Sequence, residues 1–98
     1  VRRFELADPS LRVPHIGWNE VYAEGDQPLL AGIEPGRDFY FVHSYHVVCN
    51  DPADVLATTP YGVDFCCAVN RDNVYGVQFH PEKSQTAGFQ LLRNFLAL

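Results

Sequence analysis

The feature that most constrains the fold of this chain is the stretch FYFVHSYHVVC, Phe39 to Cys49, which is nearly continuous in aromatic and β-branched residues. A strand with one face in water alternates apolar and polar side chains, whereas an unbroken apolar run is typical of a strand covered on both faces. Such a strand needs a packed layer on each side of its sheet. The chain, or the domain to which it belongs, must therefore provide two covering layers.

Most of the other segments also predict strands. Extended structure is expected over 14–22, which reads PHIGWNEVY, and over 55–62, which reads VLATTPYG. The segments VDFCCAV and VYGVQF flank the turn Asn70–Asn73 and predict a hairpin. A turn is expected over 23–28, and a short helical turn within 29–38, where glycine and proline end it.

One helix is predicted, at the C-terminal end of the chain. Ser84 or Thr86 can act as its N-cap, and the helix is expected to run to Leu98. Its bulky apolar residues recur at helical spacing and are expected to face the core, with the polar residues opposite: Phe89, Leu92, Phe95 and Leu96 against Gln90, Arg93 and Asn94. One helix covers only part of one sheet face. We therefore expect an α/β fold in which residues 1–98 are the C-terminal portion of a single larger domain, strand-rich with a C-terminal helix.

Composition narrows the classes of partner. The 98 residues carry a formal net charge of −5, the pI is about 5.1, and no basic cluster exceeds Arg2–Arg3, so nucleic acid is not an expected partner. No apolar run approaches about 18 residues and the first residues hold no signal-peptide core, so no membrane association is expected. Three cysteines without a CxxC pattern suit a protein of the reducing cytoplasm.

The candidate chemistry lies where the last predicted strand ends, in the stretch VYGVQFHPEKS. Proline disfavours helical backbone at the residue before it, and Pro81 has a fixed φ that is compatible with extended structure. Residues two apart on an extended backbone point to the same side, so His80 and Glu82 are expected to lie together. A carboxylate that orients one ring nitrogen and leaves the other free is the base-and-orienter part of a nucleophilic triad. The alternative is a histidine that ends the strand and a glutamate placed by the helix dipole.

The nucleophile of such a triad is not evident. Cys66 and Cys67 fall inside a predicted strand, without the glycines that a sharp strand–turn–helix elbow requires, and we expect them to be core residues. Cys49 ends the long apolar run, also without an elbow. Two members of a triad are therefore expected in this chain, and the third elsewhere.

A metal site is the alternative use of the histidines. His43 and His46 form an HxxH pattern, to which His15 and His80 could add ligands. On a strand, the two side chains of HxxH point to opposite faces, unlike the pair four residues apart on a helix. We therefore expect no metal, and we expect His43 to be a core histidine and His15 a loop residue.

Several motifs together resemble one family. The stretch YGVQFHPEKS, followed by LLRNFL, is similar to the C-terminal end of class I glutamine amidotransferase domains, which have a flavodoxin-like α/β fold. VPHIGWNEV and FYFVHSYHVV, in this order, resemble the glutaminase subunits of imidazole glycerol phosphate synthase, of histidine biosynthesis. The resemblance covers essentially the whole chain. The His-Pro-Glu alone is shared by the wider superfamily, and the other two stretches are more specific.

The resemblance implies hydrolysis of glutamine to glutamate and ammonia by a Cys-His-Glu triad, without a cofactor. It makes His80 the general base and Glu82 its orienter, and it places the nucleophilic cysteine in an N-terminal half that residues 1–98 do not include. The implied partner is the cyclase subunit, a (β/α)₈ barrel that receives the ammonia through a channel. That subunit acts on a phosphorylated ribulosyl-aminoimidazole-carboxamide.

The resemblance extends to binding residues. The backbone around Ser44 and Tyr45 resembles the segment that grips the α-amino and carboxylate groups of glutamine. Four further residues resemble positions at or near the interface with the cyclase, namely Trp18, Asn19, Tyr40 and Lys83. Trp and Tyr are common interface anchors. The alternatives are ordinary core packing for the aromatic residues and a solvated charge for the lysine.

Two other functions stay open at this point. The chain could be a non-catalytic relative that serves as a cyclase-binding module. It could also belong to another class I amidotransferase, of the anthranilate or GMP synthase type, although the PHIGWN segment argues against this.

Overall fold

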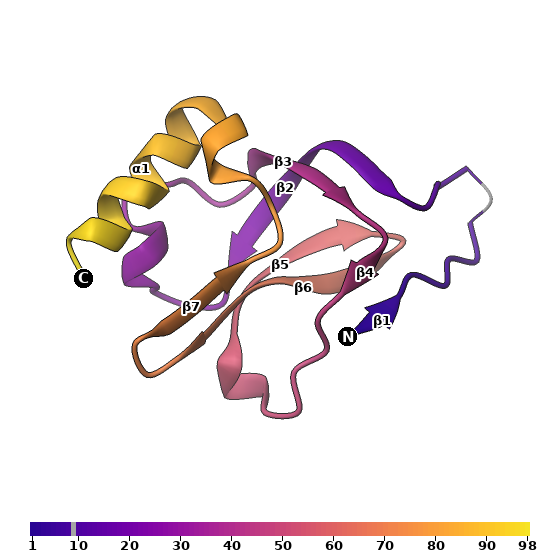
Figure 1. Ribbon diagram of the computed structural model, residues 1–98, viewed down its shortest axis with the longest axis horizontal. Coiled ribbons are helices and arrows are strands. Elements are labelled where there is room, and N and C mark those ends of the chain that lie inside the picture. Colours follow the sequence, from indigo (N-terminus) through magenta and orange to yellow (C-terminus); the bar gives the residue numbers. More distant parts are fainter. Residues whose placement is uncertain (9) are drawn as a thin grey trace.

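Five strands form an antiparallel sheet in the computed structural model, which describes residues 1–8 and 10–98 (Figure 1). Their order across the sheet is β3-β2-β5-β6-β7. Their bounds are β2 His15–Ala23, β3 Arg37–His43, β5 Val55–Tyr61, β6 Val63–Arg71 and β7 Val74–Val77. A separate antiparallel pair joins β1, Arg2–Arg3, to β4, Tyr45–His46.

The helical elements lie mostly at one end of this sheet. The α-helix α1 spans Gln85–Leu96 and packs beside the 3₁₀ helix η1, Pro28–Leu30 (Figure 1). A second 3₁₀ turn, η3, covers Pro81–Lys83 and connects the end of β7 to α1. The 3₁₀ turn η2, Pro52–Asp54, precedes β5 and begins after Asp51, whose carboxylate accepts the Ala53 N–H. None of the described helices is long and apolar enough to cross a membrane.

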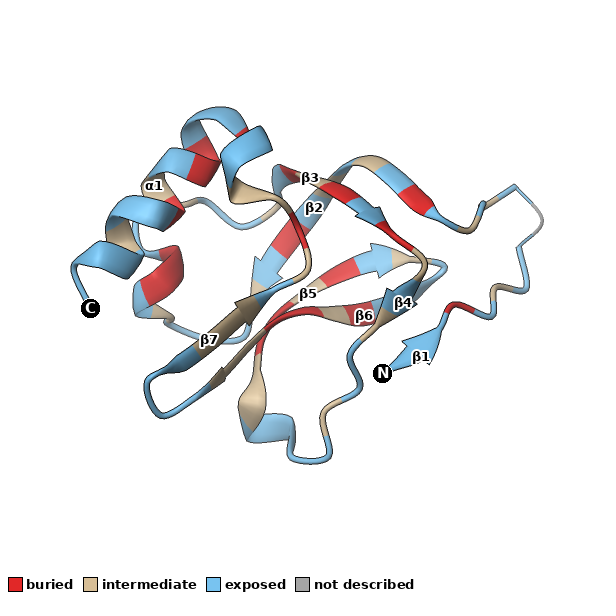
Figure 2. Cartoon of the chain, in the orientation of Figure 1, coloured by how far each residue is buried: buried red, intermediate tan, exposed pale blue. Residues whose placement is uncertain are grey.

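The core is built from alternate residues of the strands. Along β3, Phe39, Phe41 and His43 are buried, whereas the residues between them are partly or well exposed (Figure 2). This alternation follows from strand geometry, because successive side chains point to opposite faces. The other large buried side chains come from several elements: Phe4, Leu29, Leu56, Phe65 and Phe79.

Most of the expected elements are confirmed. The predicted segment 14–22 covers β2 except for its last residue, the segment 55–62 contains β5, and a short helical turn precedes β3. The β6–β7 hairpin turns at Asp72, whose φ of 54° is the left-handed conformation that Asp tolerates in tight turns. A strand-rich α/β fold with a C-terminal helix is therefore what the chain adopts.

The long apolar run is not a single strand covered on both faces, so this prediction was wrong. β3 ends at His43, and after Ser44 the chain pairs with β1 instead. β3 is an edge strand of the five-stranded sheet and buries one face. Val42, on the other face, is 43% exposed, because nothing in the described part of the chain packs over it.

The helix begins where expected but buries a different face, so this prediction was also wrong. Phe89 and Phe95 are 63% and 50% exposed, and Leu92 and Leu96 are exposed as well. The buried residues are the smaller Ala87 and Gly88, together with Leu91. Small residues face inward because α1 approaches η1 and η3 closely.

Asn94 shows the same reversal. It was expected on the outer face of the helix, yet its Nδ2 donates hydrogen bonds to the carbonyls of Leu29 and Ala31, at 2.9 and 2.8 Å. These two carbonyls lie at the end of η1, where the helical bonding pattern leaves backbone acceptors free. A polar side chain therefore joins α1 to η1.

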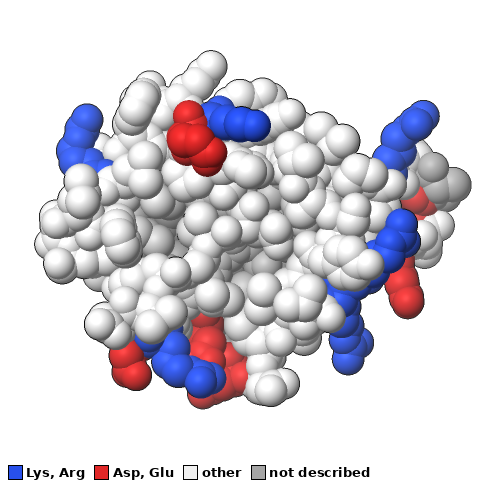
Figure 3. Space-filling view, viewed as in Figure 1, with Lys and Arg blue, Asp and Glu red and all other residues white. Residues whose placement is uncertain are grey.

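Charged side chains lie mainly around the edge of the face shown in Figure 3. The middle of this face, over the sheet, carries no Lys, Arg, Asp or Glu (Figure 3). The net charge of −5 could be read from the sequence, but the separation of charged side chains from the middle of this face could not.

Candidate active site

The two candidate catalytic side chains lie together just beyond the end of β7. Nδ1 of His80 is 3.4 Å from Oε2 of Glu82, an ion-pair distance that is longer than an ordinary charge-assisted hydrogen bond. The side chains are 38% and 57% exposed, so the imidazole can be reached from outside the described chain. The contact uses Nδ1, which leaves Nε2 as the nitrogen available to a reacting group.

The backbone brings this pair together in a different way from the one that the sequence predicted. His80 is extended, with φ −103° and ψ 97°, as expected before a proline. The chain then enters η3 at Pro81, where an extended continuation was expected. The 3₁₀ turn, closed by the Lys83 N–H donating to the His80 carbonyl at 3.0 Å, folds Glu82 back towards the imidazole.

Hydrogen bonds to β3 hold this turn in place. The His80 N–H donates to the Tyr40 carbonyl at 2.9 Å. The hydroxyl of Ser84 donates to the His80 carbonyl at 2.6 Å and accepts the Tyr40 N–H at 3.0 Å. The N–H and the carbonyl of both His80 and Tyr40 are thus hydrogen-bonded. These bonds hold the backbone that carries the imidazole in place.

Ser84 is a site residue that the sequence analysis did not identify as one. Ser84 or Thr86 was expected to be the N-cap of the helix. Ser84 holds the N-cap position, but its side chain makes no capping hydrogen bond and bridges η3 to β3 instead. It is 2% exposed. A serine before a helix is a common capping signal, and nothing in the sequence distinguishes this second use.

Gly88 is a second residue whose role the sequence analysis missed. A Cβ built at this position would lie 1.8 Å from the carbonyl oxygen of Pro81, so only glycine fits between α1 and η3. An isolated glycine within a helical pattern often marks such a close approach, and this was the available signal.

Three of the four predicted interface residues lie side by side. The rings of Trp18, on β2, and Tyr40, on β3, meet edge to face with their centroids 5.7 Å apart. Nζ of Lys83 lies 5.9 Å from the centroid of the Tyr40 ring. Trp18 is 51% exposed, and a cavity of about 420 Å³ opens beside it, next to Ser84. These residues form a continuous surface with the His80–Glu82 turn.

Asn19 does not join this surface. It follows Trp18 on a strand, and its side chain therefore points to the opposite face. There its Nδ2 donates to the Pro60 carbonyl at 2.7 Å and lies 3.2 Å from Nε2 of His15. His15, expected in a loop, is a buried residue of β2, so this prediction was wrong.

The candidate glutamine-binding residues follow the end of β3. Ser44 lies four residues beyond Tyr40, which corresponds to about 13 Å along an extended chain from the point where His80 docks. The Ser44 carbonyl accepts the Phe4 N–H at 3.1 Å, and the Tyr45 carbonyl accepts from Nδ1 of His43 at 2.8 Å. The Tyr45 side chain is 55% exposed.

Two of the three cysteines are poorly suited to act as a nucleophile. Burial is the main cause that raises the pKa of Cys67 to about 12 and that of Cys66 to about 11, which disfavours the reactive thiolates. Sγ of Cys49 lies 3.9 Å from that of Cys66, and all three thiols are free. No group of three or more His, Cys, Asp or Glu residues within 1–8 and 10–98 could hold a metal ion.

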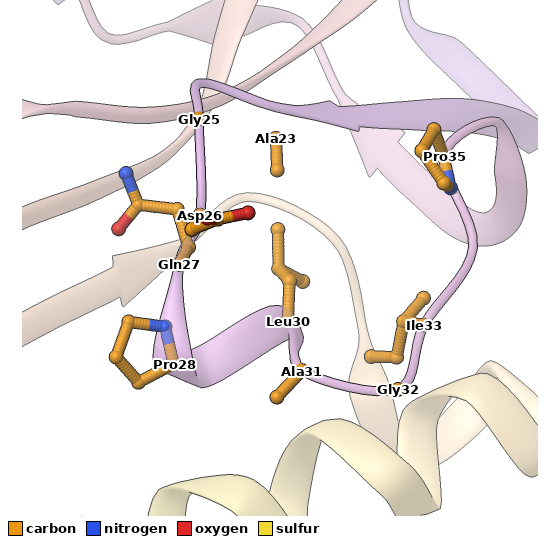
Figure 4. Close-up of a pocket in the computed structure, with 10 residues that line it drawn as sticks. All are labelled: Ala23, Gly25, Asp26, Gln27, Pro28, Leu30, Ala31, Gly32, Ile33 and Pro35. Carbon is orange, nitrogen blue, oxygen red and sulfur yellow. The ribbon is translucent and has the colours of Figure 1, made fainter.

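Another pocket lies away from this site. It has a volume of about 510 Å³ and is lined by η1 and the loops on either side of it (Figure 4). Asp26 carries the only charged side chain drawn in this lining, and neither His80 nor Glu82 contributes to it. The pocket is therefore separate from the candidate active site.

Comparison with known proteins places this arrangement in a family. Residues 8–98 match the family described as glutamine amidotransferase class-I, and the chain therefore belongs to that family. Among curated relatives, it is 53% identical over 95 residues to the imidazole glycerol phosphate synthase subunit HisH of Leptospira borgpetersenii, which covers 97% of this chain and 47% of that protein. It is 51% identical over 102 residues to the HisH subunit of Nitrosomonas europaea, covering 98% and 48%, and 54% identical over 97 residues to that of Rhodospirillum rubrum, covering 98% and 45%. The chain thus spans about half the length of these relatives, and the resemblance seen in its motifs is confirmed.

Proposed function

We propose that this chain is the C-terminal half of the glutaminase subunit of an imidazole glycerol phosphate synthase, an enzyme of histidine biosynthesis. The observation that carries the proposal is the His80–Glu82 pair, which hydrogen bonds to β3 hold just beyond the end of β7. The chain that contains this pair is 53% identical to a HisH subunit. The reaction is hydrolysis of glutamine to glutamate and ammonia by a Cys-His-Glu triad.

The geometry supports a division of roles within the triad. Glu82 faces Nδ1 of His80 and orients the ring, which leaves Nε2 to take the proton of a cysteine thiol. The thiolate attacks the carboxamide carbon of glutamine, and the imidazolium returns the proton to the departing ammonia. Water then cleaves the thioester to give glutamate and to restore the thiol. Glu82 stabilises the imidazolium between these two proton transfers.

The cysteine is proposed to come from an N-terminal half of the same domain, on a nucleophile elbow. Two observations support this division. The chain spans about half the length of its relatives, and large apolar side chains stand exposed on both the sheet and the helix, among them Ile16, Val42, Phe89 and Phe95. An exposed apolar area of this kind marks a surface that another layer covers. Ser44 and Tyr45 are proposed to bind the α-amino and carboxylate groups of glutamine.

The partner is proposed to be the cyclase subunit, with which the chain would form a heterodimer that passes ammonia through a channel. The surface of Trp18, Tyr40 and Lys83 is the proposed contact, because it presents two aromatic anchors and a cation next to the catalytic turn. Asn19 is proposed to lie near this contact, with its side chain on the opposite face of β2. A cytoplasmic location is proposed, since the described cysteines are free thiols. Nucleic acid is not a proposed partner, because the net charge is negative.

A glutaminase assay of the complete subunit, with and without the cyclase, tests the proposal. His80→Ala is expected to lower turnover by roughly 10²–10⁴-fold, as loss of a general base does. Asp72→Ala, at the tip of the β6–β7 hairpin, is the control and is expected to keep normal turnover. Normal turnover in His80→Ala would reject the catalytic role. A complete subunit that binds the cyclase but releases no glutamate would favour the non-catalytic module, and activation by a different synthase subunit would favour another class I amidotransferase.

A further inference from the structure

A chain of hydrogen bonds with two buried histidines at its centre runs between β2 and β4. It runs from Asn19 through His15 and His43 to the carbonyl of Tyr45. Nδ2 of Asn19 is 3.2 Å from Nε2 of His15, Nδ1 of His15 is 2.9 Å from Nε2 of His43, and Nδ1 of His43 is 2.8 Å from the Tyr45 oxygen. His15 is 3% exposed and His43 is 8% exposed.

The carbonyl at one end fixes the direction of every hydrogen bond in this chain. A carbonyl only accepts, so Nδ1 of His43 must carry a proton. Burial, as the main cause, lowers the pKa of His43 and lowers that of His15 to about 4, so each ring is neutral near pH 7 and carries one N–H. Nε2 of His43 then accepts from Nδ1–H of His15, and Nε2 of His15 must accept in turn.

The other end of the chain satisfies this requirement independently. Oδ1 of Asn19 accepts the Glu20 N–H at 2.8 Å, and Nδ2 donates to the Pro60 carbonyl at 2.7 Å. These two contacts orient the amide so that its N–H₂ group, and not its oxygen, faces His15. Both ends of the chain therefore predict the same protonation, with the proton on Nδ1 and none on Nε2 in each histidine.

Aromatic rings enclose the two histidines. The rings of Phe41 and Tyr61 stack on His15, with centroids at 4.9 and 4.0 Å, and those of Phe4 and Phe65 lie 5.2 and 5.1 Å from His43. Such surroundings offer the imidazoles few other partners. Loss of one bond would therefore leave a buried polar atom unsatisfied and would free the neighbouring ring to turn.

We propose that this hydrogen-bond chain positions the backbone of Ser44 and Tyr45 for glutamine, with His15 and His43 as positioning residues. The proposal rests on the proposed function, which assigns this backbone to the substrate. Two successive carbonyls are held, that of Ser44 by the Phe4 N–H and that of Tyr45 by His43. Because each peptide unit is planar, fixing these carbonyls also fixes the direction of the two N–H groups that follow them.

The experiment uses the complete subunit together with its cyclase. Long-range ¹⁵N–¹H NMR of the imidazoles near pH 7.5 reports which nitrogen of each ring is protonated. Nδ1 is expected to carry the proton in both His15 and His43, with Nε2 bare. In His15→Leu, which removes the donor to His43, the KM for glutamine is expected to rise roughly 2- to 10-fold, the effect of one neutral hydrogen bond. Turnover at saturation should change by less than about twofold, since only substrate binding is affected.

Two further variants separate positioning from packing. His15→Asn keeps an N–H near the position of Nδ1 and is expected to restore most of the affinity for glutamine. His46→Leu removes an imidazole from the same aromatic cluster, where its ring lies 4.7 Å from that of Phe4 and its Nδ1 has no described hydrogen-bond partner. It is expected to change KM less than His15→Leu does.

Several results would overturn the proposal. They are a proton on Nε2 of His43, an unchanged KM in His15→Leu, and an equal rise in His46→Leu. If His15→Leu does not fold, the protonation pattern and His15→Asn decide the question. A complete wild-type subunit that releases no glutamate would instead refute the proposed function, and the role in glutamine binding would fall with it.

Discussion

Replacing Gly88 by alanine is the perturbation whose effect the structure specifies most directly. The new Cβ would lie 1.8 Å from the carbonyl oxygen of Pro81, 2.8 Å from its carbonyl carbon and 3.1 Å from Cβ of Ser84. Contacts below 3.0 Å are essentially never made by a real Cβ, so α1 and η3 must separate by at least 1.2 Å along the line to the Pro81 oxygen. The obstacle is backbone and cannot rotate away.

The stability of the variant should change little. Alanine is favoured over glycine inside a helix by about 1 kcal/mol, whereas overpacking costs about 1–3 kcal/mol. The free energy of unfolding of the complete subunit is therefore expected to fall by roughly 0–2 kcal/mol, which corresponds to a decrease in Tm of at most about 8 °C for a protein about twice as long as this chain.

The activity should change much more. The displaced carbonyl belongs to the residue directly after His80, and the shift is passed to the His80–Glu82 pair and to Ser84. A misplacement of about 1 Å at a catalytic group can lower the rate by roughly 10²-fold. We therefore expect kcat for glutamine hydrolysis by the complete subunit with its cyclase to fall about 100-fold.

Gly76→Ala is the matched control. Gly76 lies on β7, four residues before His80, and its added Cβ would meet only the tip of the Val69 side chain, at 3.1 Å. This variant is expected to keep turnover within about threefold, because a side chain can move aside where backbone cannot. Gly88→Ala with normal turnover and an unchanged Tm would show that α1 does not approach η3 as closely as described, and would refute the reasoning.

Three further predictions concern the isolated chain, the buried histidines and the exposed face of α1. The 98-residue chain alone is expected to release no glutamate from glutamine, because its thiols do not form a nucleophile site; measurable, saturable release by the pure chain would contradict this. In urea titrations of the complete subunit, the burial that lowers the pKa of His15 and His43 should make stability full above pH 6.5. Stability should decrease below this pH, for His15 down to about pH 4, by at most about 1.4 kcal/mol per pH unit for each histidine. The slope should be shallower in His15→Asn, and an equal slope would refute the assignment. Phe95→Ala in the complete subunit should cost about 3–5 kcal/mol if another layer covers α1, against less than about 0.5 kcal/mol for a residue left at the surface.

Local patterns predicted the elements of this fold well, because strands and turns depend on neighbouring residues. The β6–β7 hairpin followed from two apolar segments around Asn70–Asn73. The pairing of His80 with Glu82 was predicted from a spacing of two residues, although the backbone reason differs, since Pro81 begins a 3₁₀ turn. A turn type depends on hydrogen bonds to Tyr40 and Ser84 that no local pattern contains.

Contacts between distant residues were the part that the sequence did not reveal. His15 was expected in a loop, yet it is buried because β2 pairs with β3 in a register that sets it directly opposite His43. Asn19 was grouped with Trp18 because both resemble interface positions of the family, but strand alternation sends their side chains to opposite faces. The place of His15 depends on the register of two strands separated by a long connection, which periodicity within one strand does not determine. The separation of Asn19 from Trp18, in contrast, follows from strand alternation alone and could have been predicted.

The reversed helix face has a different cause. α1 carries two adjoining apolar stripes, a bulky one with Phe89, Leu92 and Leu96 and a small one with Ala87, Gly88 and Leu91, and hydrophobicity alone favours the bulky stripe as the core face. Yet Gly88 can lie against η3 only if the small stripe faces inward, and Asn94 reaches η1 only in that orientation. A helix that is apolar on two sides is suited to a position between two packed layers. The bulky stripe is therefore better explained as a surface for the proposed N-terminal half than as a misplaced core, and the same holds for Val42 on the uncovered face of β3.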